Sequence, residues 1–241
     1  LVRTKQVTPL ELAETAIARI EEMDPKLNAV VIRTFDIARR AAVNPPQGPF
    51  SGVPFLLKNI GSMWKDTPLT NGFTFMQDYV CKDDSELSRR IKAAGFLLLG
   101  RTNTPEGGWC IGTEPKMYGP TKNPWNAAIT PGGSSGGAGA AVAARLVPIA
   151  EGSDGGGSIR VPASCNGVVG LKPSRGRITL GPQVADAFHG GALTFAISRT
   201  VRDSAAMLDA TGYAQAADPF QAPAKDGPYL DEVSRSPGKL R

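Results

Sequence analysis

The chain has 241 residues, of which 41% are hydrophobic and 20% charged, a composition typical of a folded globular protein and not of a disordered one. Its 27 lysines and arginines outnumber 22 acidic residues, for a net charge of +5, but no basic run gathers them, so the sequence does not predict nucleic-acid binding. No apolar stretch approaches the roughly 18 residues that a membrane-spanning helix needs, so we expect no membrane segment.

The first part of the chain predicts two helices and a strand. A capping box at Thr8, with a proline at the first helical position, predicts a helix over residues 9–23. A second helix is expected over 35–42, where the prolines that follow stop it. Residues 52–58 then form a short apolar segment typical of a buried strand, with Lys58 at its carboxyl end.

The rest of the chain continues the alternation of helices and strands. Helices are predicted over 84–94, 138–144 and 201–211, and strands over 96–100, 146–150 and 167–171. This alternation predicts an α/β fold with a mixed, mostly parallel central sheet covered by helices on both faces. Residues 213–238, rich in Ala, Pro and Asp, are expected to lie on the surface.

The glycines are concentrated in one part of the chain. Thirteen of the 28 lie between residues 132 and 181, which indicates backbone brought close to another group. Two nucleotide-binding explanations fail. A P-loop requires a lysine followed by serine or threonine, and no lysine in this chain is followed by either residue. A dinucleotide-binding fingerprint requires G-x-G-x-x-G between a strand and a helix, which neither glycine cluster provides.

A third explanation is the nucleophile elbow of α/β-hydrolases. Residues 133–137 match its G-x-S-x-G pattern, centred on Ser135, and Asp186 and His189 follow in the order that the mechanism needs. The elbow also requires a strand directly before the serine, whereas residues 125–131 make a poor strand with prolines nearby. The sequence therefore disfavours this triad but leaves it open.

A fourth explanation combines two serines with a lysine. Ser134 lies in the glycine loop, Ser158 follows three consecutive glycines, and Lys58 ends an apolar strand. A serine hydroxyl attacks well only when a base removes its proton. A lysine can be that base if burial lowers its pKa from about 10.4. The glycines before Ser158 leave backbone N–H groups accessible, as an oxyanion hole requires.

Several blocks of the sequence closely resemble the amidase signature family. The longest are 132–137 and 152–162, and further matches lie at 52–58, 100–106, 123–126 and 167–173. The resemblance implies the amidase signature fold and a Ser–cis-Ser–Lys triad. In that triad Ser158 is the acylated nucleophile, Ser134 the bridging serine after a cis peptide bond from Gly133, and Lys58 the base.

The resemblance also implies the surroundings of this triad. The oxyanion hole would consist of the N–H groups of Gly155, Gly156, Gly157 and Ser158, and the reaction calls for no metal and no organic cofactor. The family commonly has an aspartate where this chain has Asn59, which removes a charge near the base. Supporting roles are expected for Ser135, Asp154 and Arg160, the last two as an ion pair that braces the nucleophile loop.

For the tryptophans and cysteines we expect structural roles and no direct part in the chemistry. Trp109 and Trp125 are predicted to have a packing role and not to contact a substrate. The three cysteines form no C-x-x-C pair, so we predict neither a disulfide framework nor a zinc site, and we expect a cytoplasmic protein. The cysteine side chains are expected to be small buried groups: Cys81, Cys110 and Cys165.

The function implied by the resemblance is that of an amidase, a hydrolase acting on carbon–nitrogen bonds other than peptide bonds. The expected partner is a small-molecule amide, linear or cyclic, and the blocks at 101–106 and 113–115 favour 6-aminohexanoate oligomers. A homodimer is the assembly considered, with no nucleic acid and no membrane. Because chains of this family are longer, residues 1–241 are expected to be the N-terminal, catalytic part of a single amidase domain that is truncated here.

Two alternatives stay open. One is the glutaminase subunit of a tRNA-dependent amidotransferase, which belongs to an obligate complex and supplies ammonia. The other is a non-catalytic remnant that binds an amide without cleaving it.

Overall fold

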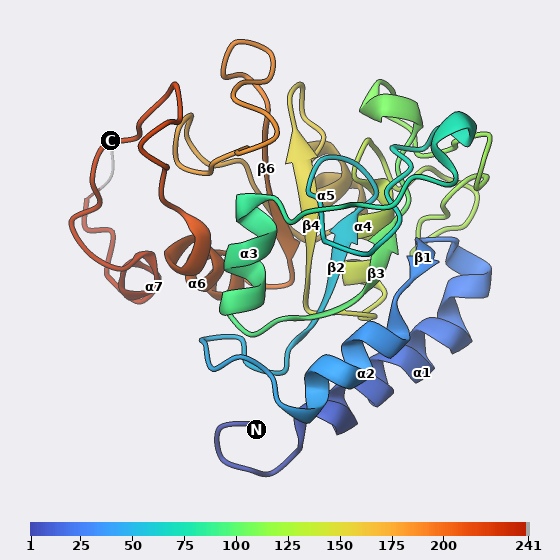
Figure 1. The fold of residues 1–241 in the computed structure, drawn as a ribbon, viewed down its shortest axis with the longest axis horizontal. Coiled ribbons are helices and arrows are strands. Elements are labelled where there is room, and N and C mark those ends of the chain that lie inside the picture. The colour runs from blue at the N-terminus through green and yellow to red at the C-terminus, as the bar shows by residue number, and fades with distance from the viewer. Residues whose placement is uncertain (240–241) are drawn as a thin grey trace.

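The computed structural model describes residues 1–239, which are built around one six-stranded sheet (Figure 1). The strand order is β1-β3-β2-β4-β6-β5. The strands are β1 (Val30–Arg33), β2 (Pro54–Lys58), β3 (Leu97–Thr102), β4 (Ile149–Asp154), β5 (Val169–Leu171) and β6 (Leu193–Ser198). The α-helices are α1 (Pro9–Leu27), α2 (Phe35–Val43), α3 (Glu86–Ala93), α4 (Gly136–Ala143), α5 (Arg160–Asn166), α6 (Val201–Thr211) and α7 (Tyr229–Glu232), with 3₁₀ turns at Thr74–Met76 and Glu106–Gly108.

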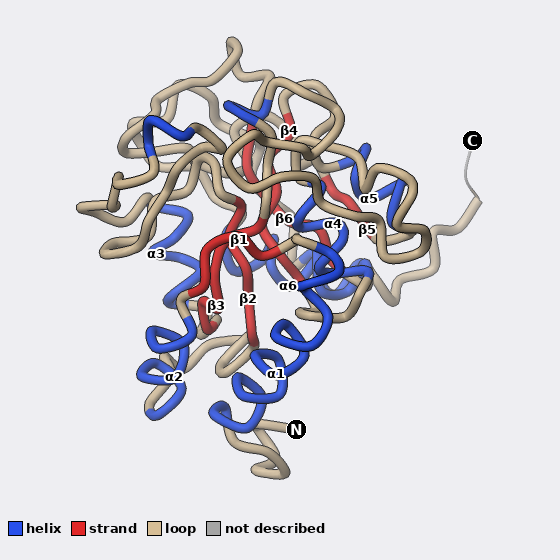
Figure 2. The backbone as a smooth tube through the Cα atoms, turned by 90° about the vertical axis from the view of Figure 1, so that its right-hand side faces the viewer, coloured by secondary structure: helices blue, strands red, loops and turns tan. Residues whose placement is uncertain are grey.

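Helices cover both faces of the sheet, as predicted. Figure 2 shows α2 and α3 on one side of the strands and α1, α4 and α5 on the other. α6 packs against β6 and α3. Every residue of β2, β3 and β6 is buried as a result. Within residues 1–239, no helix combines the length and apolar character that crossing a membrane would require.

The sheet is mixed, and its parallel part is limited to three central strands. β2 pairs in parallel with β3 and β4, whereas β1 is antiparallel to β3, and β6 is antiparallel to both β4 and β5. Only two of the five pairings are therefore parallel, fewer than predicted, although four of the six strands share one direction. The sequence analysis missed β1 and β6. β6 is antiparallel to β5 because segment 172–192, which connects the two strands, contains no crossover helix.

The helix boundaries follow local signals where those signals exist. The Thr8 side chain accepts the Glu11 N–H at 3.1 Å and the Glu11 carboxylate accepts the Thr8 N–H at 2.7 Å, so the predicted capping box starts α1. Strand β4 lies later than predicted, because its second half consists of the polar or small residues 151–154, which are typical of a loop.

Helix α4 packs closely against the rest of the fold because its residues are small. A Cβ on Gly137 would lie 2.7 Å from the carbonyl oxygen of Asn103 and 2.8 Å from that of Ala29. No side chain fits in that space without moving the backbone around it. The glycines of α4 thus bring its N-terminus, and the loop before it, up to the carboxyl ends of the central strands.

We expect Gly137→Ala to lower the free energy of unfolding by roughly 1–3 kcal/mol, because overpacking outweighs the better helix propensity of alanine. Urea unfolding measures this loss. Gly227→Ala is the control, since a Cβ at Gly227 has no neighbour within 4 Å. Equal stability of the two variants would contradict the close approach of α4.

Candidate active site

The predicted base Lys58 is the last residue of β2 and lies at the carboxyl end of this central strand (Figure 1). Its side chain is fully buried. Nζ donates one hydrogen bond to Ser134 Oγ at 2.7 Å and another to Ser153 Oγ at 2.9 Å. The structure thus joins two of the three predicted catalytic residues directly.

Burial changes the acid–base chemistry of this amine. Removal from water lowers the pKa of Lys58 from 10.5 to about 7, although the nearby Glu151 and Asp154 carboxylates act in the opposite direction. Near neutral pH a large share of Lys58 is therefore uncharged. An uncharged amine has a free lone pair and can accept a proton from the Ser134 hydroxyl.

Ser134 is positioned by the glycine loop that leads into α4. The peptide bond between Gly133 and Ser134 is cis, as the resemblance implied. A Cβ on Gly133 would lie 2.8 Å from the carbonyl oxygen of Gly112, so glycine is needed where these two segments cross. Ser134 is itself buried and is held against Lys58.

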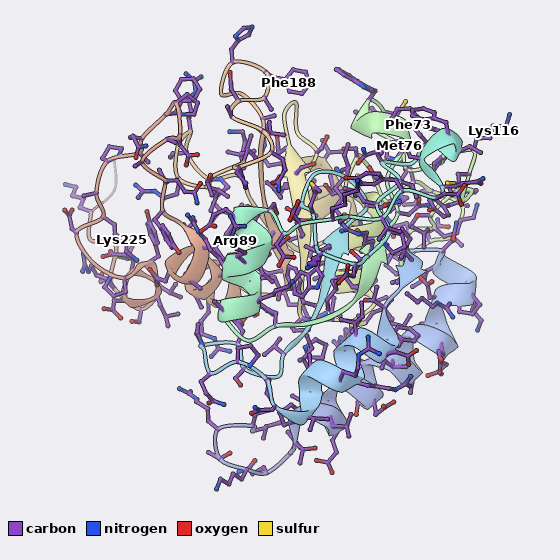
Figure 3. The ribbon with its side chains drawn as sticks, in the orientation of Figure 1. Phe73, Met76, Arg89, Lys116, Phe188 and Lys225 are labelled. Atoms are coloured by element: carbon purple, nitrogen blue, oxygen red, sulfur yellow. The ribbon has the colours of Figure 1, made fainter. Side chains whose placement is uncertain are left out.

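Ser158 lies on the wall of the cavity that Ser134 also lines. This cavity has a volume of about 460 Å³, and its wall includes Gly155, Gly156 and Phe188. Figure 3 shows Phe188 on a loop close to the carboxyl end of β4. Among residues 1–239 the Ser158 hydroxyl has no hydrogen-bond partner, so the structure places it near Ser134 without a bond between them.

The loop that carries Ser158 is braced by Asp154, the last residue of β4. Its carboxylate accepts the N–H groups of Gly157 at 2.8 Å and Ile159 at 3.2 Å. The Arg160 guanidinium donates to both carboxylate oxygens at 2.9 Å, so the predicted ion pair is present. Burial alone would raise the pKa of Asp154, but the bonds from Arg160 and the backbone hold it below its usual value.

One member of the predicted oxyanion hole is already bonded. The N–H of Gly157 donates to Asp154, and Gly157 is buried, so this N–H is not free for a substrate, contrary to the prediction. The buried carboxylate needs several donors to be stable, and Gly157 is one of them. Within the described chain, the N–H groups of Gly155, Gly156 and Ser158 have no acceptor, and all three residues line the cavity.

Ser135 supports the site by tying the glycine loop to β4. Its Oγ accepts the Ser153 N–H at 3.2 Å and donates to the Ser153 carbonyl at 3.3 Å, while its own N–H donates to the Ser158 carbonyl at 3.2 Å. Ser153, which also bonds to Lys58, was missed by the sequence analysis. The predicted strand ended at residue 150, so Ser153 had no fixed position.

Asn59, the departure from the family pattern, is buried, and both its amide nitrogen and its amide oxygen are hydrogen-bonded. Its amide nitrogen donates to Thr70 Oγ1 at 2.8 Å, and its amide oxygen accepts the Thr70 N–H at 3.0 Å. An amide both donates and accepts, which matches this pair of contacts, whereas an ionised aspartate only accepts. Asn59 therefore holds the segment after β2 without adding a charge beside Lys58.

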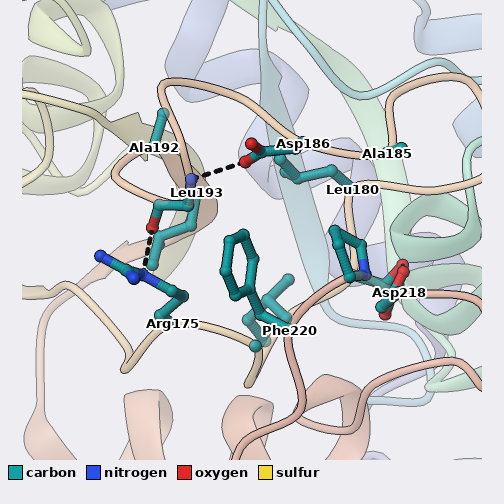
Figure 4. Close-up of a pocket in the computed structure, with 13 residues that line it drawn as sticks. Arg175, Leu180, Ala185, Asp186, Ala192, Leu193, Asp218 and Phe220 are labelled. Atoms are coloured by element: carbon teal, nitrogen blue, oxygen red, sulfur yellow. Dashed lines mark hydrogen bonds between the residues drawn. The ribbon is translucent and has the colours of Figure 1, made fainter.

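The alternative triad of Ser135, Asp186 and His189 is not assembled. No strand precedes Ser135, its hydroxyl is bonded to the backbone of β4, and His189 is exposed. Asp186 accepts the Gly190 N–H at 2.6 Å within its own loop, beside the small pocket in Figure 4. That pocket has a volume of about 30 Å³, room for a water molecule but not for a substrate.

The expectations for the tryptophans and two cysteines were wrong. Trp109 and Trp125 are 75% and 72% exposed. Trp109 lies edge-on to Phe188 with ring centroids 5.5 Å apart, and both side chains line the cavity. Cys81 is buried, but Cys110 and Cys165 are exposed. Trp109, Cys110 and Trp125 lie in irregular segments, where no periodic pattern indicates which side chains face inward.

Comparison with known proteins identifies the family. A family model described as Amidase matches residues 11–241, and the chain belongs to this family, that of the amidase signature enzymes. It is 46% identical over 245 residues to the 6-aminohexanoate-cyclic-dimer hydrolase of Paenarthrobacter ureafaciens, covering 100% of this chain and 50% of that protein.

Solved structures agree with this assignment. A structure of 6-aminohexanoate cyclic dimer hydrolase complexed with substrate is similar at a TM-score of 0.96 and 44% identity, over 100% of this chain and 51% of that one. A glutamyl-tRNA(Gln) amidotransferase subunit from Thermotoga maritima is similar at a TM-score of 0.76 and 30% identity, over 90% and 46%. The chain thus spans about half the length of the relatives it matches.

We expect Asp154→Asn to destabilise the protein at neutral pH, because the loop N–H groups and Arg160 lose a charged acceptor. Since the folded state holds the pKa of Asp154 low, the wild-type advantage is present above about pH 4 and is lost as pH falls further. Urea unfolding at several pH values measures it. The control is Asp83→Asn, which alters an exposed aspartate, and a pH-independent difference would contradict the role of charge.

Proposed function

We propose that this protein is an amidase that hydrolyses carboxylic-acid amides through an acyl-enzyme on Ser158. The observation that carries the proposal is the 2.7 Å hydrogen bond between Ser134 and the buried amine of Lys58. Burying an ionisable amine is costly, and an apolar side chain would fill the space more cheaply. A proton relay to a serine nucleophile, in contrast, needs such an amine.

The first half of the proposed reaction forms a tetrahedral intermediate on Ser158. Uncharged Lys58 accepts the Ser134 proton, and Ser134 accepts the Ser158 proton as Ser158 Oγ bonds to the amide carbon. The Ser158 hydroxyl turns toward Ser134 when substrate binds, since catalytic hydrogen bonds often form fully only in the complex. The N–H groups of Gly155, Gly156 and Ser158 stabilise the oxyanion.

The second half forms the acyl-enzyme on Ser158 and releases the products. The proton held by Lys58 passes through Ser134 to the amine nitrogen, the carbon–nitrogen bond breaks, and the amine leaves. Water, deprotonated by the same base, then attacks the ester carbon and releases the acid with Ser158 restored. The scheme calls for no metal and no organic cofactor, and residues 1–239 contain no cluster of three or more potential metal ligands.

The proposed substrate is a small amide, linear or cyclic, and 6-aminohexanoate oligomers are the first to test. The names of the relatives support this, and so does the wall of the cavity. Its side chains include Ile60, Trp109, Ile111 and Phe188, which suit an aliphatic chain. Among the described lining residues, Asp154 is the one charged group. Its carboxylate already accepts hydrogen bonds from Gly157 and Arg160.

The two alternatives have less support. Glutamine carries an ammonium and a carboxylate, which require charged partners that the described part of this cavity does not offer. Hydrolysis of glutamine but not of aliphatic amides, with co-purification of tRNA and a partner protein, would favour the glutaminase. A binding remnant has no use for a lowered Lys58 pKa, and failure of Ser158 to react with a fluorophosphonate would favour it.

Three further properties belong to this proposal. Residues 1–241 form the N-terminal, catalytic part of a single amidase domain. The three cysteines are free thiols, which supports a cytoplasmic location, and cell fractionation tests it. A homodimer is the assembly that we propose to test, by sedimentation equilibrium.

Ser158→Ala should abolish amide hydrolysis and labelling by a fluorophosphonate, because the attacking oxygen is gone. The rate of amide hydrolysis should be at least ~10³-fold lower than in the wild type, as in other serine hydrolases without their nucleophile. Ser164→Ala is the control, because Ser164 is an exposed serine on α5 that does not line the cavity, and this variant should keep labelling. Undiminished turnover in Ser158→Ala would refute the assignment of the nucleophile.

The rate of Ser158 labelling should fall as pH decreases through about 7, where the pKa of Lys58 lies, because only the uncharged amine accepts a proton. Lys58→Met should be inactive at every pH. The unfolded chain binds this proton up to a pKa near 10.5, so between pH 7 and 10.5 the free energy of unfolding should rise with pH. A labelling rate that stays constant down to about pH 5 would rule out Lys58 as the base.

A further inference from the structure

The backbone of Lys58 is held in an unusual way on its β4 side. β2 pairs with β3 along its whole length, from Pro54 to Lys58, but its pairing with β4 is limited to Leu56 and Ala150. Two residues further on, the Lys58 N–H donates to the Oε2 of Glu151 at 3.0 Å. A carboxylate side chain therefore takes the place of a backbone carbonyl in the ladder.

The carbonyl group of Lys58 is held by a second buried charge. Arg101, on β3, donates from Nη1 to the Lys58 carbonyl at 3.1 Å and to the Ser62 carbonyl at 2.9 Å. Both Glu151 and Arg101 are fully buried. The two backbone groups of Lys58 are thus bonded to an acidic and a basic side chain from the two strands that flank it.

This arrangement is a poor way to gain stability. Within residues 1–239, the Oε1 of Glu151 and the Nε of Arg101 have no hydrogen-bond partner. Buried charges with incomplete hydrogen bonding contribute little net stability, and apolar residues of similar size often do as well. The pair therefore fits a role in setting the properties of Lys58 better than a role in holding the fold.

The charges that face Lys58 form a small set. Glu151 and Asp154 approach it from β4 and Arg101 from β3, while Arg160 neutralises Asp154 from α5 and the Cys81 thiol contacts Arg101. With Glu151 ionised, its charge offsets that of Arg101 and favours the ammonium form of Lys58. With Glu151 uncharged, Asp154 would be the remaining carboxylate that favours the ammonium form, and its charge is paired with Arg160.

We propose that Glu151 is a positioning residue that fixes the backbone of Lys58 and, through its negative charge, sets the proton affinity of the Lys58 amine. The charge keeps the amine basic enough to take a proton from serine in spite of its burial. The inference rests on the proposed function only for the use of that proton. The geometry and the charge effect hold for Lys58 whatever the reaction.

Glu151→Gln separates charge from geometry, because its amide oxygen can still accept the Lys58 N–H. We expect the Lys58 titration midpoint, followed by ¹⁵N NMR of lysine Nζ and assigned by its loss in Lys58→Met, to fall by roughly 1 pH unit. The acid limb of Ser158 labelling should shift to lower pH with it. A midpoint that is unchanged or raised would overturn the proposal.

Two further variants control this measurement. Asp24→Asn removes another buried carboxylate, one that accepts the N–H groups of Ala29 and Val30, and should leave the Lys58 midpoint in place. Glu151→Asp keeps the charge but shortens the side chain, so we expect a midpoint near that of the wild type with a slower labelling rate. A midpoint in Glu151→Asp as low as in Glu151→Gln would contradict the role of charge.

A measurement on the wild-type protein does not depend on how any variant folds. Burial raises the pKa of Glu151 to about 7, close to that of Lys58, although Ser62, Arg101 and Lys58 oppose the rise. The ionisation of Glu151 is therefore followed directly, by side-chain ¹³C NMR. The proposal requires an ionised carboxylate where Lys58 titrates, and a Glu151 protonated throughout that range would overturn it. The NMR titrations need no turnover, so a failed amidase assay would overturn the proposed function and leave this inference standing.

Discussion

The burial of one amine at the carboxyl end of the central strand organises this structure. Lys58 is out of contact with water, and two serine hydroxyls receive its hydrogen bonds. The two hydroxyls belong to different segments of the chain. Ser134 lies on a glycine loop, which can approach the sheet this closely only because its residues are small. Ser153 lies on β4. Gly133 and Gly137 are thus required because backbone packs closely around the segment that holds Ser134 against the buried lysine.

A second constraint is the carboxylate of Asp154, which organises the loop after β4. It collects N–H groups and the Arg160 guanidinium on one side of the loop. The remaining N–H groups, those of Gly155, Gly156 and Ser158, belong to residues on the cavity wall. One side of this short segment is therefore bonded to Asp154, and the other side carries the N–H groups that we propose stabilise an oxyanion.

The sequence predicts some of this better than the rest, for physical reasons. Capping at Thr8 is a local signal and placed the start of α1 correctly. The resemblance to the amidase signature family selected Lys58 and Ser134, which the structure joins, while the roles of the triad stay predictions. Glu151 and Ser153 escaped notice because polar residues inside a buried strand carry no hydrophobic pattern. The bond of Gly157 to Asp154 depends on loop geometry, which composition does not encode.

The central claim is that Ser158 becomes acylated when the protein cleaves an amide. Its most direct test is to mix the protein with an aliphatic amide, quench with acid during turnover, and map the modified peptide by mass spectrometry. The account predicts the acyl mass on Ser158, and no adduct in Lys58→Met. Hydrolysis with an adduct on another residue, or with none under conditions that trap an ester, would contradict it.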